Sequence, residues 1–252
     1  MEINPYQGTL HGRQAPEPKP RQFRANLLGC MLVIGVVAVL IFLFLPVTRS
    51  ARPAARRMQC ANNLKQIGIA LVTYEEKYGA LPPAHTVDAE GKPLHSWRTL
   101  ILPMMEQEPL YQKIDLSKPW DDPANKVAFD FSVPAYSCPS ATSPPSHTTY
   151  MAVAVPGSCF KPTEPRKLSE ITDGHNSTMM VMEVDDKQAV HWMSPTDSID
   201  LSFLNQKTGL PHSRGFQVVF VDGSVHFLNV DIKPETLRAL ITIDGKDVVG
   251  DY

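Results

Sequence analysis

The most apolar part of the chain is the stretch 27–45, which contains no charged residue. At a rise of about 1.5 Å per residue, a helix of this length extends roughly 28 Å, close to the ~30 Å hydrocarbon core of a bilayer. A cleaved signal peptide is the alternative, because Ala51, Ala54 and Ala55 follow the stretch, but its apolar region is normally shorter, roughly 7–15 residues. The pattern therefore predicts an uncleaved, single-pass transmembrane helix over 27–46, with lipid around 27–45.

A stripe of apolar residues with helical spacing follows this predicted anchor. Its members recur every three or four positions, as one face of an α-helix requires: Cys60, Leu64, Ile67, Leu71, Tyr74 and Tyr78. Gly79 suits the position just past a helix end, and Pro82-Pro83 prevents the helix from resuming. Pro46 and Pro53 are expected to interrupt the backbone between the anchor and this amphipathic helix.

The second half of the chain is rich in strand-like runs. Two of them, 216–221 and 224–229, flank Asp222-Gly223, and an Asp-Gly pair favours a two-residue type I′ hairpin turn. Both faces of the first run are largely apolar, so the hairpin is expected to be central. Shorter runs of β-branched and aromatic residues predict strands at 135–138, 149–155, 178–184 and 190–192.

Short helices are predicted between these runs. They start after Ser96, over 106–114, at Asp121 or Asp122 before Pro123, and over 234–241. The fold class is then α+β, with an N-terminal transmembrane helix and a long amphipathic helix packed on an antiparallel β-sheet. We expect a disordered, proline-punctuated tail over 1–26, the anchor over 27–46, and one domain over 47–252.

Composition narrows the function only slightly. The formal net charge of −2 offers no basic field, so nucleic acid is not an expected partner. Cys60, Cys138 and Cys159 lie on the folded side; either two of them pair or all three are buried thiols. No C-x-x-C pair is present, so zinc is not expected. Basic residues flank the apolar stretch equally, so charge does not set its orientation; a short tail inside and a large domain outside is the commoner arrangement.

Six short motifs, taken together and in order, resemble a bacterial family known as domain of unknown function 1559, over roughly residues 47 to 252. The first is the sequence RRMQCANNLKQIG at 56–68, and the last, His212 followed by nine residues and Asp222-Gly223, is similar to the H-x9-DG signature of prepilin-type processing-associated proteins. The others are Ser96-Trp97-Arg98, Lys118-Pro119-Trp120-Asp121, Tyr136-Ser137-Cys138-Pro139-Ser140 and Ile171-Thr172-Asp173-Gly174.

The resemblance implies a pilin-like or pseudopilin-like body, with no established catalytic activity; we expect no cofactor. Because Cys60 and Cys138 both lie within matched motifs and Cys159 does not, the resemblance favours a Cys60–Cys138 disulfide. The motif residues, interpreted as structural, are Cys60, Asn63, Leu64, Lys65, Gln66, Trp97, Cys138, Pro139, Asp173, Gly174, His212, Asp222 and Gly223.

The chain departs from the family at its start. Family members commonly open with Gly followed by Phe-Thr-Leu-x-Glu, whereas Gly29 is followed here by Cys30-Met31-Leu32 and the apolar stretch holds no glutamate. We therefore expect a static, uncleaved anchor. The expected function is a non-enzymatic structural or interaction module at the inner membrane, with its C-terminal domain outside the cytoplasm and other envelope proteins as partners.

Two alternatives belong to other classes of function. A binding module for a solute, peptide or glycan would use the loops between Pro134 and Pro165. An envelope enzyme would use His212 and Asp222 as acid and base, with His226 and Glu183 as further candidates for catalysis or metal binding. Since the turn already explains Asp222 and strand alternation explains His226, we expect no catalytic and no metal site. The pairs Asp121-Asp122 and Asp185-Asp186 lack a twelve-residue calcium loop and are expected in caps and turns.

Overall fold

The computed structural model describes residues 21–197, 210–212 and 214–245, with the side chains of 21–26 and 43–51 left out. The chain divides into two compact units, with the boundary in the sequence between Ala51 and Arg52. Each unit is described by itself below. Residues 1–20 of the predicted disordered tail lie outside the described residues, and 21–26 are helical, so the prediction is wrong for these six.

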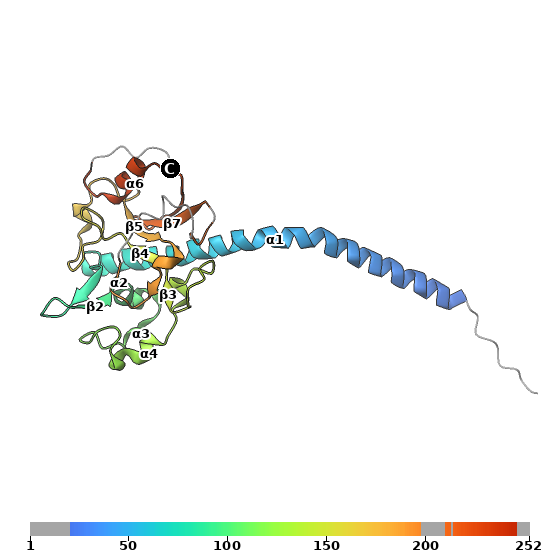
Figure 1. Ribbon diagram of the computed structural model, residues 1–252, viewed down its shortest axis with the longest axis horizontal. Helices are drawn as coiled ribbons and strands as arrows, with labels where there is room; N and C mark the ends of the chain where they lie inside the picture. The colour runs from blue at the N-terminus through green and yellow to red at the C-terminus, as the bar shows by residue number, and fades with distance from the viewer. Residues whose placement is uncertain (1–20, 198–209, 213, 246–252) are drawn as a thin grey trace, which may run out of the picture. The chain divides into compact units, whose positions relative to one another are not determined.

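Helix α1 (Arg21–Tyr78) is one continuous backbone helix, drawn from blue to cyan in Figure 1. The predicted interruption at Pro46 and Pro53 is therefore wrong. A proline ring fixes φ near −65°, which is a helical value, and it removes only one backbone donor, so a helix with helical turns on both sides continues through it at a local cost.

In the first unit, α1 exposes large apolar side chains all along the stretch from Leu27 to Phe42. Their exposed fractions run from 47% at Val37 to 77% at Phe42. Among the described residues, no helix combines the length and the hydropathy that crossing a membrane demands. The end of the predicted anchor, 43–45, belongs to the part of α1 whose side chains are not described.

The second unit is built on antiparallel strands. Among the described residues, four of them form the largest sheet, in the order β4-β5-β7-β8, so β7 lies inside the sheet and β8 at its edge. Two strand pairs, β1 with β2 and β3 with β6, lie outside it. The strands are β1 (His85–Val87), β2 (Pro93–Ser96), β3 (His147–Thr148), β4 (Tyr150–Ala152), β5 (Met179–Glu183), β6 (Val190–His191), β7 (Gly215–Phe220) and β8 (Val225–Asn229).

Short helices connect these strands, and the predicted caps hold. Ser96 accepts a bond from the amide of Arg98, and Asp122 accepts one from Ala124. The run 135–138, predicted as a strand, instead begins in a 3₁₀ helix, because Pro134 suits a first helical position. The helices are α2 (Trp97–Leu100), η1 (Leu102–Met105), α3 (Glu108–Tyr111), η2 (Pro123–Asn125), α4 (Lys126–Phe129), η3 (Pro134–Tyr136), η4 (Leu168–Glu170), η5 (Asp186–Gln188) and α6 (Pro234–Ile241).

The β7–β8 hairpin forms, but the prediction that it is central holds only for β7, since β8 is an edge strand, and the hairpin's turn is not type I′. The amide of Gly223 donates to the carbonyl of Phe220, and only the glycine of the Asp222-Gly223 pair has a positive φ, of 75°. That geometry is a three-residue loop with a left-handed glycine at its end. We attribute the longer loop to Val221. Its amide donates to the carbonyl of Thr178, just before β5, so the pairing with that segment continues past the end of β7.

The core has a layer on each face of the sheet. On one face, the stripe of α1 from Cys60 to Leu71 packs with Val181 and Val219. On the other face, Leu237 and Leu240 of α6 pack with Phe216, Val218 and Phe220 of β7. Tyr74 is partly buried against the core, whereas Tyr78, the last member of the predicted stripe, is 56% exposed. The mixed helix and antiparallel-sheet class is thus confirmed.

Gly68 brings α1 close to the sheet, and it gives a first prediction. A Cβ added at Gly68 would lie 2.8 Å from Cγ1 of Val219 and 3.3 Å from the carbonyl oxygen of Gly223. Gly→Ala in a helix normally stabilises by about 1 kcal/mol. Here we expect Gly68→Ala to lower the free energy of unfolding by roughly 1–3 kcal/mol, because the added methyl overpacks the interface.

Thermal or urea unfolding of the full chain measures this effect. Gly35→Ala is the matched control, because nothing lies within 4 Å of a Cβ at that helical position. An unchanged or raised stability of Gly68→Ala would mean that α1 and the hairpin are not packed this closely.

Candidate functional site

Three of the six family motifs meet where α1 crosses the sheet and the segment 134–139. Asn63, buried on α1, donates from Nδ2 to the carbonyl of Ser137 at 2.9 Å and to that of Pro134 at 3.4 Å. Lys65 reaches the hairpin turn, where its Nζ donates to the carbonyl of Gly223 at 2.8 Å. The first motif therefore binds the segment before Cys138 and the turn after β7 at the same time.

At the centre of this region lies a cluster that we name the buried quartet: Cys60, Cys138, Glu183 and His212. The structure joins Cys60 to Cys138 by a disulfide with the two Cα atoms 5.2 Å apart, the pairing that the resemblance favoured. Nε2 of His212 lies 3.8 Å from Sγ of Cys138 and 3.4 Å from Oε2 of Glu183. One potential ligand atom from each residue lies within 4.8 Å of the other three, and all four residues are buried.

Burial sets the electrostatics of the buried quartet. It raises the pKa of the Glu183 carboxyl to about 8, which the backbone amide of Gln217 opposes only weakly from 3.3 Å. Burial also lowers the pKa of His212, and the charge of Arg57 adds to that effect. With the disulfide formed, burial therefore favours the uncharged forms of both groups.

The acid–base pair of the enzyme alternative does not assemble. His212 bridges to Gly215 at the start of β7, whereas Asp222 follows the end of that strand, so the two side chains lie at opposite ends of β7. Asp222 accepts a bond from the amide of Ser224 inside the turn. His226 packs edge-on against Phe220 at 5.1 Å between ring centroids.

The other motif residues have packing and backbone roles. Leu64 and Trp97 are fully buried in the core, and Asp173 accepts a bond from the amide of Gly245 at 2.7 Å. Gly174 adopts a φ of 102°, in the left-handed region that favours glycine. Gln66 and Pro139 are exposed.

The buried quartet was not predicted as a unit from the sequence. Its members come from α1, the segment after η3, β5 and the bridge before β7, and no local spacing connects them. The available signal was Glu183, a carboxylate that ends the apolar run MMVME of β5, since ionisable residues are almost never fully buried without a partner.

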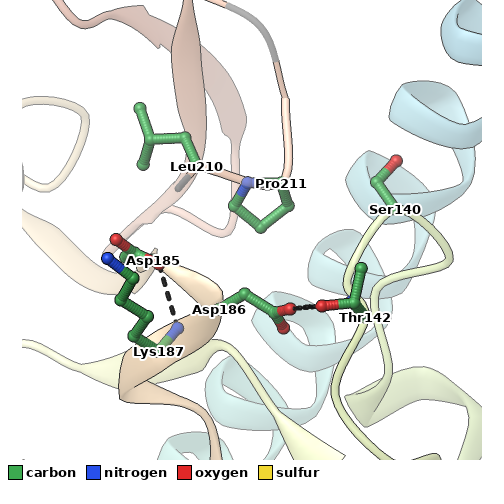
Figure 2. Close-up of a pocket in the computed structure, with 7 residues that line it drawn as sticks. All are labelled: Ser140, Thr142, Asp185, Asp186, Lys187, Leu210 and Pro211. Carbon is green, nitrogen blue, oxygen red and sulfur yellow. Dashed lines mark hydrogen bonds between the residues drawn. The ribbon is translucent and has the colours of Figure 1, made fainter. Parts of the chain in front are cut away.

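A separate pocket of about 380 Å³ is lined by seven residues, drawn in Figure 2: Ser140, Thr142, Asp185, Asp186, Lys187, Leu210 and Pro211. Its two carboxylates are already engaged. Asp186 accepts bonds from Thr142 and from the amide of Ser143, and Asp185 caps the amide of Lys187. Asp186 therefore holds the loop at 142–143 in place, and Asp185 caps a short helix; the sequence predicted caps and turns for this pair.

Comparison with known families identifies the chain. The family model SBP_bac_10, described as a protein of unknown function (DUF1559), matches residues 49–210, which is more than half of the 252-residue chain. The chain belongs to this family. The DUF1559 match contains Cys60, Cys138 and Glu183 and ends two residues before His212. Comparison with curated proteins and with solved structures found no match.

The remaining cysteine of the DUF1559 domain gives a second prediction. Cys159 is a free, fully buried thiol, and burial raises its pKa to about 12. Because the thiolate is the reactive form, a Cys30→Ser chain is expected to react with maleimide at pH 8 at least about a thousandfold slower when native than when unfolded. Mass spectrometry of the labelled chain measures the rate. Native labelling at the rate of a free thiol would place Cys159 at the surface.

Proposed function

We propose that this chain is a membrane-anchored, non-enzymatic envelope protein, with a pilin-like or pseudopilin-like domain that acts as a structural or interaction module. In this proposal residues 27–45 form the anchor in the inner membrane. The domain that starts after the anchor lies outside the cytoplasm, where it engages other envelope proteins.

The observation that carries the proposal is the distribution of exposed apolar side chains on α1. Leu27 and Leu28, and then all four residues from Met31 to Ile34, are large, apolar and more than half exposed. Consecutive positions point to different sides of a helix, so every side of this segment is apolar. A partner groove covers one stripe of a helix, whereas lipid covers all of it.

Three features of the second unit support the remaining parts of the proposal. A long helix laid against an antiparallel sheet is the arrangement that pilin-like bodies use, and here Cys60–Leu71 of α1 packs on β5 and β7. The Cys60–Cys138 disulfide favours an oxidising compartment, because thiols remain reduced in the cytoplasm. The separation of His212 from Asp222 supports a non-enzymatic role.

The pocket in Figure 2 favours one alternative, a module that binds a small polar ligand. Two of its seven lining residues, Ser140 and Thr142, belong to the loops between Pro134 and Pro165 that the sequence assigned to such a function. The anchored structural module is the better supported function, because Thr142 and Asp186 bond to each other across the pocket and leave fewer polar atoms for a ligand.

Placing two charges in the anchor tests the proposal. Each lysine at the centre of a membrane span costs about 2.5–3.5 kcal/mol on insertion. The Val37→Lys, Leu40→Lys double variant is therefore expected to lower the fraction of protein in carbonate-washed membranes at least about tenfold.

Ile69→Lys is the matched control for this test. Ile69 is an apolar residue of the same helix, 52% exposed, but it lies outside the proposed anchor. That variant should stay in the membrane pellet like the wild-type chain. The proposal fails if the double variant also stays there, or if both variants leave it equally.

A further inference from the structure

The buried quartet has the donor set of a zinc site. Two cysteine sulfurs, an imidazole nitrogen and a carboxylate oxygen are the ligand types that Zn²⁺ takes in proteins. One atom of each lies within 4.8 Å of the other three. The ligands come from separate segments of the chain, so a zinc site can form here without a C-x-x-C pair.

The distances between donors match a four-ligand site. With metal–ligand bonds of about 2.0–2.3 Å, the edges of a tetrahedron measure about 3.3–3.8 Å. His212 Nε2 lies 3.4 Å from Glu183 Oε2 and 3.8 Å from Cys138 Sγ. The two sulfurs, which are bonded to each other, have to separate for a metal ion to fit, and the remaining donor pairs already lie within 4.8 Å.

A second observation, independent of the distances, concerns Glu183. Its side chain is fully buried, and among the described residues Oε1 has no hydrogen-bond partner. A buried polar atom without a partner costs roughly 1–3 kcal/mol, so an unpaired oxygen inside a cluster of ligands suggests an absent partner. A cation at the centre of the quartet supplies that partner.

The charges around the cluster also suit a metal ion. Two thiolates, a carboxylate and Zn²⁺ sum to −1. The guanidinium of Arg57 lies 5.1 Å from the ring centre of Phe227, and that ring lies 6.5 Å from the ring of His212. The complex therefore has a fixed positive charge near it.

We propose that the reduced chain binds one zinc ion through Cys60, Cys138, His212 and Glu183, and that the Cys60–Cys138 disulfide is the oxidised, metal-free state of the same site. An external dithiol reduces the disulfide with two electrons and two protons, giving two thiols and an oxidised dithiol. Zinc binding then releases both thiol protons, and the proton of Glu183 wherever that carboxyl has one. The inference does not depend on the membrane anchor.

Cobalt(II) reports on the site directly, because thiolate–cobalt bonds absorb in the near ultraviolet and tetrahedral cobalt in the visible. The full chain in detergent is reduced in denaturant, refolded by dilution and titrated with Co²⁺; an oxidised sample is treated in parallel. We expect one Co²⁺ per reduced chain, displaced by one equivalent of Zn²⁺. Binding to the oxidised chain should be at least about a hundredfold weaker, since thiolates are required.

Four substitutions locate the metal. His212→Ala and Glu183→Gln should each weaken Co²⁺ binding at least about tenfold. Substituting a residue that only supports a metal ligand already weakens metal binding by about this factor, so losing a ligand should cost at least as much. A Cys30→Ser, Cys159→Ser chain, which keeps only the two cysteines of the site, should retain the full signal.

Three outcomes overturn the proposal: a reduced chain that takes up no cobalt, binding that survives His212→Ala unchanged, or equal binding by the oxidised chain. If His212→Ala or Glu183→Gln fails to fold, the Cys30→Ser, Cys159→Ser chain decides alone. With thiolate absorption from its two remaining cysteines and one metal per chain, the site stands; without them, it is absent.

Discussion

Replacing Cys60 and Cys138 together with alanine will lower the free energy of unfolding of the second unit by about 4 kcal/mol. The disulfide joins residues separated by 78 positions, and closing a loop of that length restricts the unfolded chain by an amount worth about 4–5 kcal/mol. Urea titration of the full chain in detergent measures the loss as a lower midpoint.

Cys159→Ala is the matched control for this prediction, because that cysteine is equally buried but forms no crosslink. Its substitution should cost about 1 kcal/mol, the effect of removing one small buried side chain. If the double variant loses no more than this control, the disulfide does not restrain the unfolded chain.

Asp197→Ala should cost about 3–5 kcal/mol, nearly as much as losing the disulfide. Nη1 of Arg98 lies 2.8 Å from Oδ1 of Asp197, and the two side chains are 0% and 2% exposed. Removing the carboxylate leaves the guanidinium buried without its counterion, which is the costly way to break an ion pair. The difference in the free energy of unfolding between the variant and the wild-type chain measures this cost.

Two further sets of variants show whether the lost stability comes from leaving a buried charge unpaired, and not from removing a charged residue in general. Replacing both partners by apolar residues, as in Arg98→Met with Asp197→Leu, should recover most of the loss, because no unpaired charge remains. Lys126→Ala breaks the exposed Lys126–Asp130 pair, with side chains 71% and 55% exposed, and should cost less than about 1 kcal/mol. Equal losses in the buried and exposed pairs would contradict the prediction.

Local sequence patterns predicted correctly the helices and strands that depend mainly on residues a few positions apart. The stripe from Cys60 to Leu71 is buried as its spacing indicated, and α6 spans the predicted residues 234–241. Both strands of the hairpin formed, since alternation and turn residues lie within a few positions of each other. The turn type was wrong, because Val221 pairs with Thr178, a contact that local preference does not contain.

The buried charged groups could not be predicted in the same way. Arg98 and Asp197 are 99 positions apart, and Cys60 and His212 are 152 positions apart (212 − 60). Such groups are brought together by the topology of the sheet, so a single sequence without the fold offers only the identity of each residue. The sequence named Glu183 and His212 only as candidates in a group with Asp222 and His226; the structure brings these two together and adds Cys60 and Cys138, which the sequence did not connect with them.

The proposed anchor is tested most directly by the partition of the wild-type chain between lipid and water. The full-length protein is mixed with lipid vesicles, washed with alkaline carbonate and high salt, and floated on a density gradient. If lipid surrounds the apolar start of α1, the chain rises with the vesicles after both washes and only detergent releases it. Recovery of the protein in the aqueous fraction, free of lipid, would contradict the account.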